Sequence, residues 1–216
     1  MVAELAGAAA AETADLRAAV RAAAAGLPAR WIGIGVAPGD AVVGPAAAGT
    51  FAGYGRDVPV ALSARALGDP PTALPLCVLV TAWLRGVANP AASAEVRTFR
   101  ADHSAESALT AGGRLRGEID VVEDPIGVLV VADGANTLSP SAPGGHDPDS
   151  VPGQGALDDA LAAGDPVALA ASAGGAVGRV AYQVLAGLAG AGPSAARQLY
   201  RGAPYGVGYF VGVWTP

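Results

Sequence analysis

The stretch Ile126-Gly-Val-Leu-Val-Val-Ala132 decides the fold class of this sequence. It is apolar along its whole length apart from one glycine, and no polar residues alternate with the apolar ones. Such a run is typical of a parallel strand whose two faces are both covered. We therefore expect a central, rigid strand here, with Asp133 as the first polar side chain after it.

Further elements on the N-terminal side of this strand predict an α/β architecture. Trp31–Val36 is a second short apolar strand, and the alanine-rich residues Glu4–Leu27 favour one helix. A further helix over Ala73–Gly86, with Thr72 as its candidate N-cap, falls between the two strands in the sequence. Helices that alternate with apolar strands predict a single domain, residues 1–216, in which helices flank a mostly parallel central sheet.

The composition argues against several classes of function. Only 15% of the residues are charged, the basic residues are scattered arginines, and the net charge is −6, so we expect no nucleic-acid partner. One cysteine and two histidines do not suffice for a multi-cysteine metal centre or a histidine cage. No apolar run is long enough to span a bilayer, and Glu4 stands where a signal peptide carries positive charge. We therefore expect a cytoplasmic protein without a membrane partner, whose low charge favours self-association as a homo-oligomer.

The segment Asp133–Gly155, which follows the apolar strand, is the first candidate for a site. It is dense in Gly, Pro, Ser, Asn and Asp, and loops of this length in compact domains are usually functional or disordered. Ligands of wound α/β sheets bind beyond the carboxyl ends of the strands. Asp133 is therefore expected to be hydrogen-bonded to nearby N–H groups or to meet a cation. The alternative is that Asp133 only caps a turn.

Four further residues complete the candidate site. His146 with Asp147 and the nearby Asp149 could hold a divalent metal or act in acid–base catalysis, or could form a surface turn. Asn136 can donate and accept hydrogen bonds but cannot take up a proton at neutral pH, which suits binding. Tyr205 stands among glycines near the C-terminus and is expected to reach the same site.

Several motifs together resemble one protein family. They are Gln198-Leu-Tyr-Arg-Gly-Ala-Pro-Tyr-Gly-Val-Gly-Tyr-Phe-Val-Gly-Val-Trp214, Val130-Val-Ala-Asp-Gly with its continuation to Pro143-Gly-Gly-His-Asp-Pro, Leu74-Pro-Leu…Ala82-Trp-Leu, and Tyr182-Gln-Val-Leu-Ala-Gly. In this order they resemble the class III extradiol ring-cleavage dioxygenase-like family that is common in actinobacteria. The resemblance covers nearly the whole chain. It implies a single α/β domain with a mostly parallel central sheet.

The resemblance also implies a cofactor, ferrous iron held by two His and one Glu, with a further His as general base. The chain departs from this pattern at each histidine. The segment with the first ligand would precede Met1, no His follows the Trp31–Val36 strand, and Asn136 stands where the base is expected. We therefore expect no ring cleavage, no assignable cofactor, and a domain that lacks the family's N-terminal strand through either a late start or a real shortening.

Two functions remain open at this point. The first is a non-catalytic member of the fold that binds a small molecule or a partner subunit through the Asp133–Asp149 loop. The second is a metal-dependent enzyme, of the non-haem iron type or another, with a rearranged site around Asp133, His146 and Asp147. Metal content distinguishes them, because only the second requires a bound ion.

Overall fold

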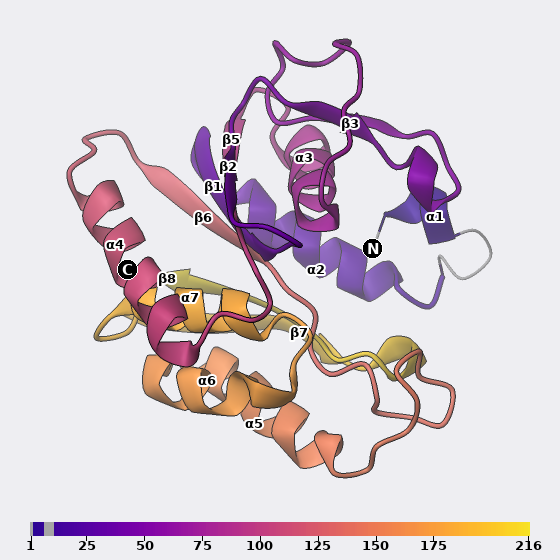
Figure 1. Cartoon of the computed structure of the whole chain (residues 1–216), viewed down its shortest axis with the longest axis vertical. Helices are drawn as coiled ribbons and strands as arrows, with labels where there is room; N and C mark the ends of the chain where they lie inside the picture. The colour runs from indigo at the N-terminus through magenta and orange to yellow at the C-terminus, as the bar shows by residue number, and fades with distance from the viewer. Residues whose placement is uncertain (1, 7–10) are drawn as a thin grey trace. The chain divides into compact units, whose positions relative to one another are not determined.

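The computed structural model describes residues 2–6 and 11–216, which fold into two compact units (Figure 1). The first unit comprises Met1–Arg100 and Glu123–Val131, and the second comprises Ala101–Val122 and Ala132–Pro216. The chain therefore leaves one unit for the other after residues 100, 122 and 131. That the two units form the single domain expected for residues 1–216 stays a prediction.

The first unit is built on a four-stranded sheet of β1 (Arg30–Val36), β2 (Ala41–Val43), β5 (Ser93–Phe99) and β6 (Ile126–Val131), in the order β2-β5-β1-β6. β1 pairs in parallel with β5 and β6, and only the short β2 is antiparallel. The predicted α/β class with a mostly parallel sheet flanked by helices is confirmed. The prediction that the Ile126 strand is central is wrong, because β6 ends this strand order and β1 is central. Most β6 residues are only half-buried, so the continuous apolar run did not indicate burial on both faces.

Helix α3 (Leu76–Ala88) packs on this sheet, and two glycines of β1 allow its close approach. A Cβ on Gly35 would overlap the side chain of Cys77, and a Cβ on Gly33 would lie 3.1 Å from Thr81 Oγ1. Burial removes the Cys77 thiol from water and raises its pKa to about 11. A thiol with such a pKa is protonated at neutral pH and is therefore a packing group rather than a nucleophile.

The N-terminal helix differs from the sequence prediction. In place of one helix over Glu4–Leu27, the structure has α1 (Ala3–Ala6) and α2 (Ala14–Ala25) with a turn at residues 11–13. The part of the predicted helix at residues 7–10 lies outside the described residues. High helix propensity alone therefore did not carry one helix through residues 11–13.

Thr72 does not cap α3, in contrast to the prediction. Its hydroxyl and its backbone N–H both donate to the carbonyl oxygen of Ala48, at 3.1 and 2.9 Å. These bonds tie the segment before α3 to β3 (Ala48–Thr50), which pairs with β4 (Pro59–Ala61) in a two-stranded antiparallel sheet. The helix begins only after Pro75, whose ψ of 152° is not helical.

The second unit is mainly helical and ends in a hairpin. Its elements are α4 (Ala105–Asp120), α5 (Ser150–Ala163), α6 (Pro166–Ser172), α7 (Arg179–Ala189), β7 (Ala195–Gly202) and β8 (Tyr209–Thr215). Helices α4 and α7 lie side by side (Figure 1). A Cβ on Gly112 would overlap the carbonyl oxygen of Val184, and one on Gly187 would overlap that of Leu109. The two glycines therefore permit a close helix crossing that a larger residue would prevent.

Candidate binding site after strand β6

The loop after β6 is shorter than the sequence predicts. Helix α5 begins at Ser150, so residues 132–149 form the loop in place of Asp133–Gly155. Asp147 starts the helix: its carboxylate accepts a hydrogen bond from the Asp149 N–H at 3.1 Å, and its carbonyl accepts one from the Ser150 hydroxyl at 2.7 Å. Asp147 therefore acts in the surface turn that was the alternative to a metal-ligand role.

The first four loop residues, 132–135, form what we call the Asp133 segment, and its carbonyls are held by α7. The Tyr182 hydroxyl donates to the carbonyl of residue 132 at 3.2 Å. The backbone N–H groups of Gly178 and Val177, at the N-terminal end of α7, donate to the carbonyls of residues 133 and 134 at 2.8 and 3.1 Å. Three consecutive carbonyls thus have fixed partners.

The opposite side of the Asp133 segment is held by the chain just before β8. The Gly134 N–H donates to the Gly208 carbonyl at 3.2 Å, and the Gly208 N–H donates to the Ala135 carbonyl at 2.8 Å. A Cβ on either glycine would overlap the side chain of Gln154. The two glycines therefore form a cradle for one glutamine side chain, which only residues without a Cβ can provide.

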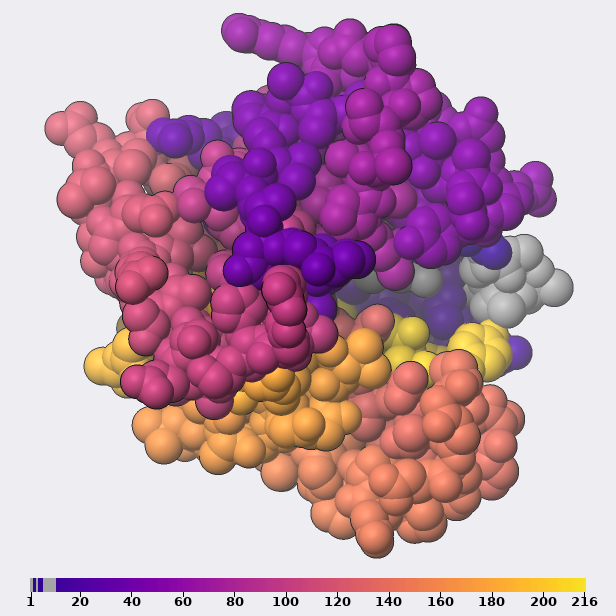
Figure 2. Space-filling view, viewed as in Figure 1, coloured from indigo at the N-terminus to yellow at the C-terminus, as the bar shows by residue number. Residues whose placement is uncertain are grey.

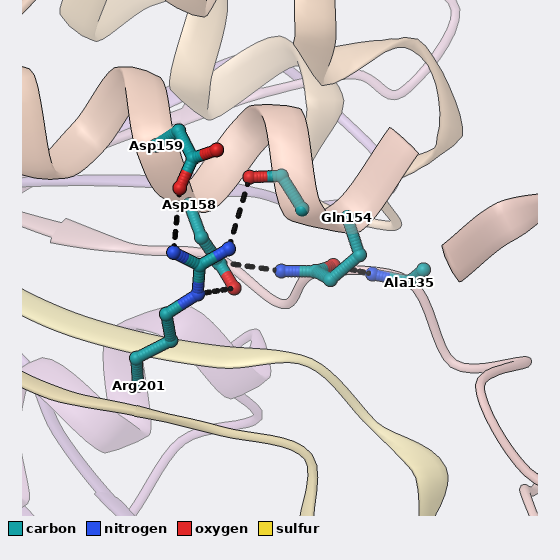
Figure 3. Close-up of polar contacts among 6 residues, drawn as sticks. Ala135, Gln154, Asp158, Asp159 and Arg201 are labelled. Carbon is teal, nitrogen blue, oxygen red and sulfur yellow. Dashed lines mark hydrogen bonds and ion pairs between the residues drawn. The ribbon is translucent and has the colours of Figure 1, made fainter. Parts of the chain in front are cut away.

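Gln154 connects the Asp133 segment to a buried polar network in the second unit (Figure 3). Its Oε1 accepts from the Ala135 N–H at 2.7 Å, and its Nε2 donates to the Asp158 carboxylate at 2.7 Å. Arg201 of β7 binds Asp158 through Nε at 2.9 Å and Asp159 through Nη1 at 2.6 Å. Burial raises the pKa of Asp158, while its bonds to Gln154 and Arg201 oppose that shift. The network anchors the loop to α5 and β7.

The Asp133 side chain itself differs from its backbone, since it has no partner. It is exposed, and its carboxylate makes no hydrogen bond or ion pair with any described residue. The expected bond to a nearby N–H is therefore not formed within the described ranges. Although the residue is exposed as a whole, neighbouring atoms desolvate its carboxyl group and raise its pKa.

The other predicted residues border the same loop. The Asn136 carbonyl accepts from the Gly144 N–H at 2.9 Å, and the N–H of Asp147 donates to the carbonyl of residue 137 at 3.0 Å. These bonds close a subloop that carries His146, which is exposed and lies at the surface (Figure 2, salmon). Tyr205 has a left-handed φ of 58°, and the carbonyl of the next residue accepts from the N–H of residue 138. No hydrogen bond among the described residues joins Asp133 to His146.

The residues present do not fit the ferrous centre that the family resemblance implies. Such a centre needs three ligands that meet at one point, two of them histidine. Within the described ranges no three His, Cys, Asp or Glu side chains come close enough to hold a metal ion. His103, the second of the two histidines, precedes α4, where its carbonyl accepts from Arg179 at 2.9 Å. We therefore derive no step through iron.

Sequence reasoning missed the polar network of Gln154, Asp158, Asp159 and Arg201. One signal was available: Gln154 and Asp158 are four residues apart, the spacing that brings side chains together on a helix. The predicted loop extended to Gly155, however, and so placed Gln154 outside any helix. No spacing rule could connect Arg201 to Asp159, which is 42 residues away in the chain.

Comparison with known proteins assigns no family. No protein-family model matches the chain, and no curated protein is similar enough to match it. In the described part of the chain, no helix is both long and apolar enough to cross a membrane. The function is therefore inferred from the chemistry of the residues after β6.

Proposed function

We propose that this chain is a binding protein of the class III extradiol dioxygenase-like fold that does not cleave aromatic rings. In this proposal it takes a small molecule at the Asp133–Asp149 loop. The motif resemblance supports the family, and the confirmed α/β fold class agrees with it. A cytoplasmic location and self-association stay predictions.

The observation that carries the proposal is the contrast between the backbone and the side chain of Asp133. Hydrogen bonds from α7, from Gly208 and from Gln154 fix the backbone around it. Its carboxylate, in contrast, is exposed and unpaired among the described residues. A charged group on a rigid support binds a ligand without the entropic cost of ordering that support.

The chemistry of the neighbouring side chains supports binding rather than ring cleavage. Proton abstraction from a catechol requires a base whose pKa is near neutrality. Asn136 stands at the position that the resemblance assigns to that base, and a carboxamide takes up no proton at neutral pH. It can still donate and accept hydrogen bonds, as a recognition group does.

The absence of ring cleavage is tested with an oxygen electrode. Purified protein is incubated with added ferrous iron and with protocatechuate or catechol, and a ring-cleaving extradiol enzyme serves as positive control. We expect no catechol-dependent oxygen uptake, because no described residues supply the iron triad. Oxygen uptake that a chelator abolishes would overturn the proposal.

The binding half is tested by recording ¹⁵N–¹H spectra of the protein with a set of small polar aromatic compounds. We expect at least one compound to shift the amide signals of residues 133–149 selectively. Asp133→Ala, Asn136→Ala and His146→Ala should each weaken these shifts and leave the rest of the spectrum unchanged. Shifts that fall only outside this loop would contradict the assigned site.

A further inference from the structure

Two tyrosines of the β7–β8 hairpin lie on one face beside the Asp133 segment. Gly202 of β7 is paired with Tyr209 of β8, so positions 202 and 209 share a face. The Tyr200 hydroxyl lies 2.6 Å from where a Cβ on Gly202 would stand, which places its phenol against Tyr209. The small residue at 202 therefore lets two phenols come together.

The Asp133 carboxylate is next to this pair of phenols. The bonds between Gly134 and Gly208 set Asp133 and Tyr209 at neighbouring positions on two adjacent segments. Burial raises the pKa of Tyr209, and the negative charge of Asp133 raises it further, as does Tyr200. Within the described residues the Tyr209 hydroxyl has no hydrogen-bond partner. Two polar groups that face each other thus remain available to a ligand.

The positive groups of the second unit near these side chains are already engaged. Arg201 is bound by Asp158 and Asp159. Arg179, which follows Gly178 in the chain, donates to the carbonyls of Ala101 and His103 at 2.7 and 2.9 Å. The local charge at Asp133 is therefore negative, which favours a cationic ligand and disfavours an anionic one.

We propose that Asp133, Tyr209 and Tyr200 bind the primary ammonium group of a small organic amine. An ammonium group has three N–H donors and no acceptor, so it matches a carboxylate and a phenol oxygen. The Asp133 bond is charge-assisted, and the faces of the two phenols attract a cation. This inference rests on the proposed function and specifies the ligand class of the same site.

The test compares two probes of equal shape, 2-phenylethylammonium chloride and 2-phenylethanol, at constant ionic strength. Binding is followed through the amide signals of residues 133–135 and 208–209 at millimolar probe concentrations. We expect the ammonium probe to bind at this position and the alcohol to bind at least about tenfold more weakly, the effect of one charge-assisted hydrogen bond.

Three variants assign the effect to the proposed groups. Asp133→Ala should weaken ammonium binding about tenfold or more, and Tyr209→Phe, which loses only a hydroxyl, should weaken it several-fold. Asp149→Ala is the matched control, because it removes the same charge from an exposed position of the same loop and should leave the affinity unchanged. An equal loss in Asp149→Ala would mean that only net charge matters and would overturn the proposal.

The remaining outcomes separate this inference from the proposed function. Equal binding of the alcohol and the ammonium probe at residues 133–135 would refute the ammonium preference and leave a small-molecule site in place. If the ammonium probe does not bind at all while other compounds shift the loop signals, the ligand class is wrong and the site is retained. If no compound shifts the loop signals, both are wrong.

Discussion

Two aspartates that follow neighbouring parallel strands have different roles in this protein. Asp40 comes after β1, and its carboxylate accepts a hydrogen bond from the Arg100 backbone N–H at 2.7 Å. Asp133 comes after β6, and its carboxylate has no such partner among the described residues. Each stands close to a glycine in the sequence, and each side chain is exposed. The difference lies in what supports the turn.

The turn after β1 is held partly by its own aspartate, whereas the turn after β6 is held without it. At the first turn the Thr98 hydroxyl adds a bond to the Gly39 carbonyl at 2.8 Å. At the second, the supporting groups are the amide of Gln154 and the backbone of α7 and Gly208. A carboxylate without a structural task is therefore the better candidate for binding.

The largest effect on this comparison should come from Gln154→Leu. Leucine keeps the approximate volume but leaves the buried Ala135 N–H without its acceptor and removes one donor from Asp158. We expect a loss of about 3 kcal/mol in the free energy of unfolding, since each buried unsatisfied group costs about 1–3 kcal/mol. Urea denaturation measures it, with the exposed Gln198→Leu as a control that should change little. Equal effects of the two substitutions would show that the Gln154 bonds do not support the turn.

A smaller effect is expected from the glycine of each turn. A Cβ at Gly134 would overlap Gln154 and lie 2.7 Å from the Gly208 carbonyl oxygen, whereas a Cβ at Gly39 would meet nothing within 4 Å. Gly134→Ala should therefore destabilise the protein by about 2 kcal/mol, the typical cost of overpacking. Gly39→Ala should leave the melting temperature almost unchanged. Calorimetry on both variants is decisive, and a larger loss for Gly39→Ala would reverse our description of the two turns.

The strands were predictable from the sequence because their signal is local. Trp31–Val36 is apolar and short, and the structure forms β1 over Arg30–Val36. The apolar Ile126 run likewise forms a strand, but its place at the end of the sheet depends on which strand pairs with it. Periodicity carries no information about the partner, so strand order could not be read from the residues.

The start of α5 and its polar network could not be predicted for two physical reasons. Residues Ser150–Gly155 include one proline and two glycines, which usually indicate a loop. Proline is tolerated here because the first turn of a helix needs no N–H from it. The Arg201 contacts then join α5 to β7 across more than forty residues. Of the candidate site, Asp133 and its loop were predictable, while the groups that fix their geometry were not.

The central claim is that Asp133 is exempt from structural work that Asp40 performs. It is tested most directly by measuring the free energy of unfolding of Asp40→Ala and Asp133→Ala in parallel. Asp40→Ala should lose about 1 kcal/mol, the net value of one hydrogen bond. Asp133→Ala should stay within about 0.5 kcal/mol of the unsubstituted protein, as exposed substitutions do. A loss in Asp133→Ala equal to or larger than that in Asp40→Ala would contradict the claim, because the carboxylate would then be needed for the fold.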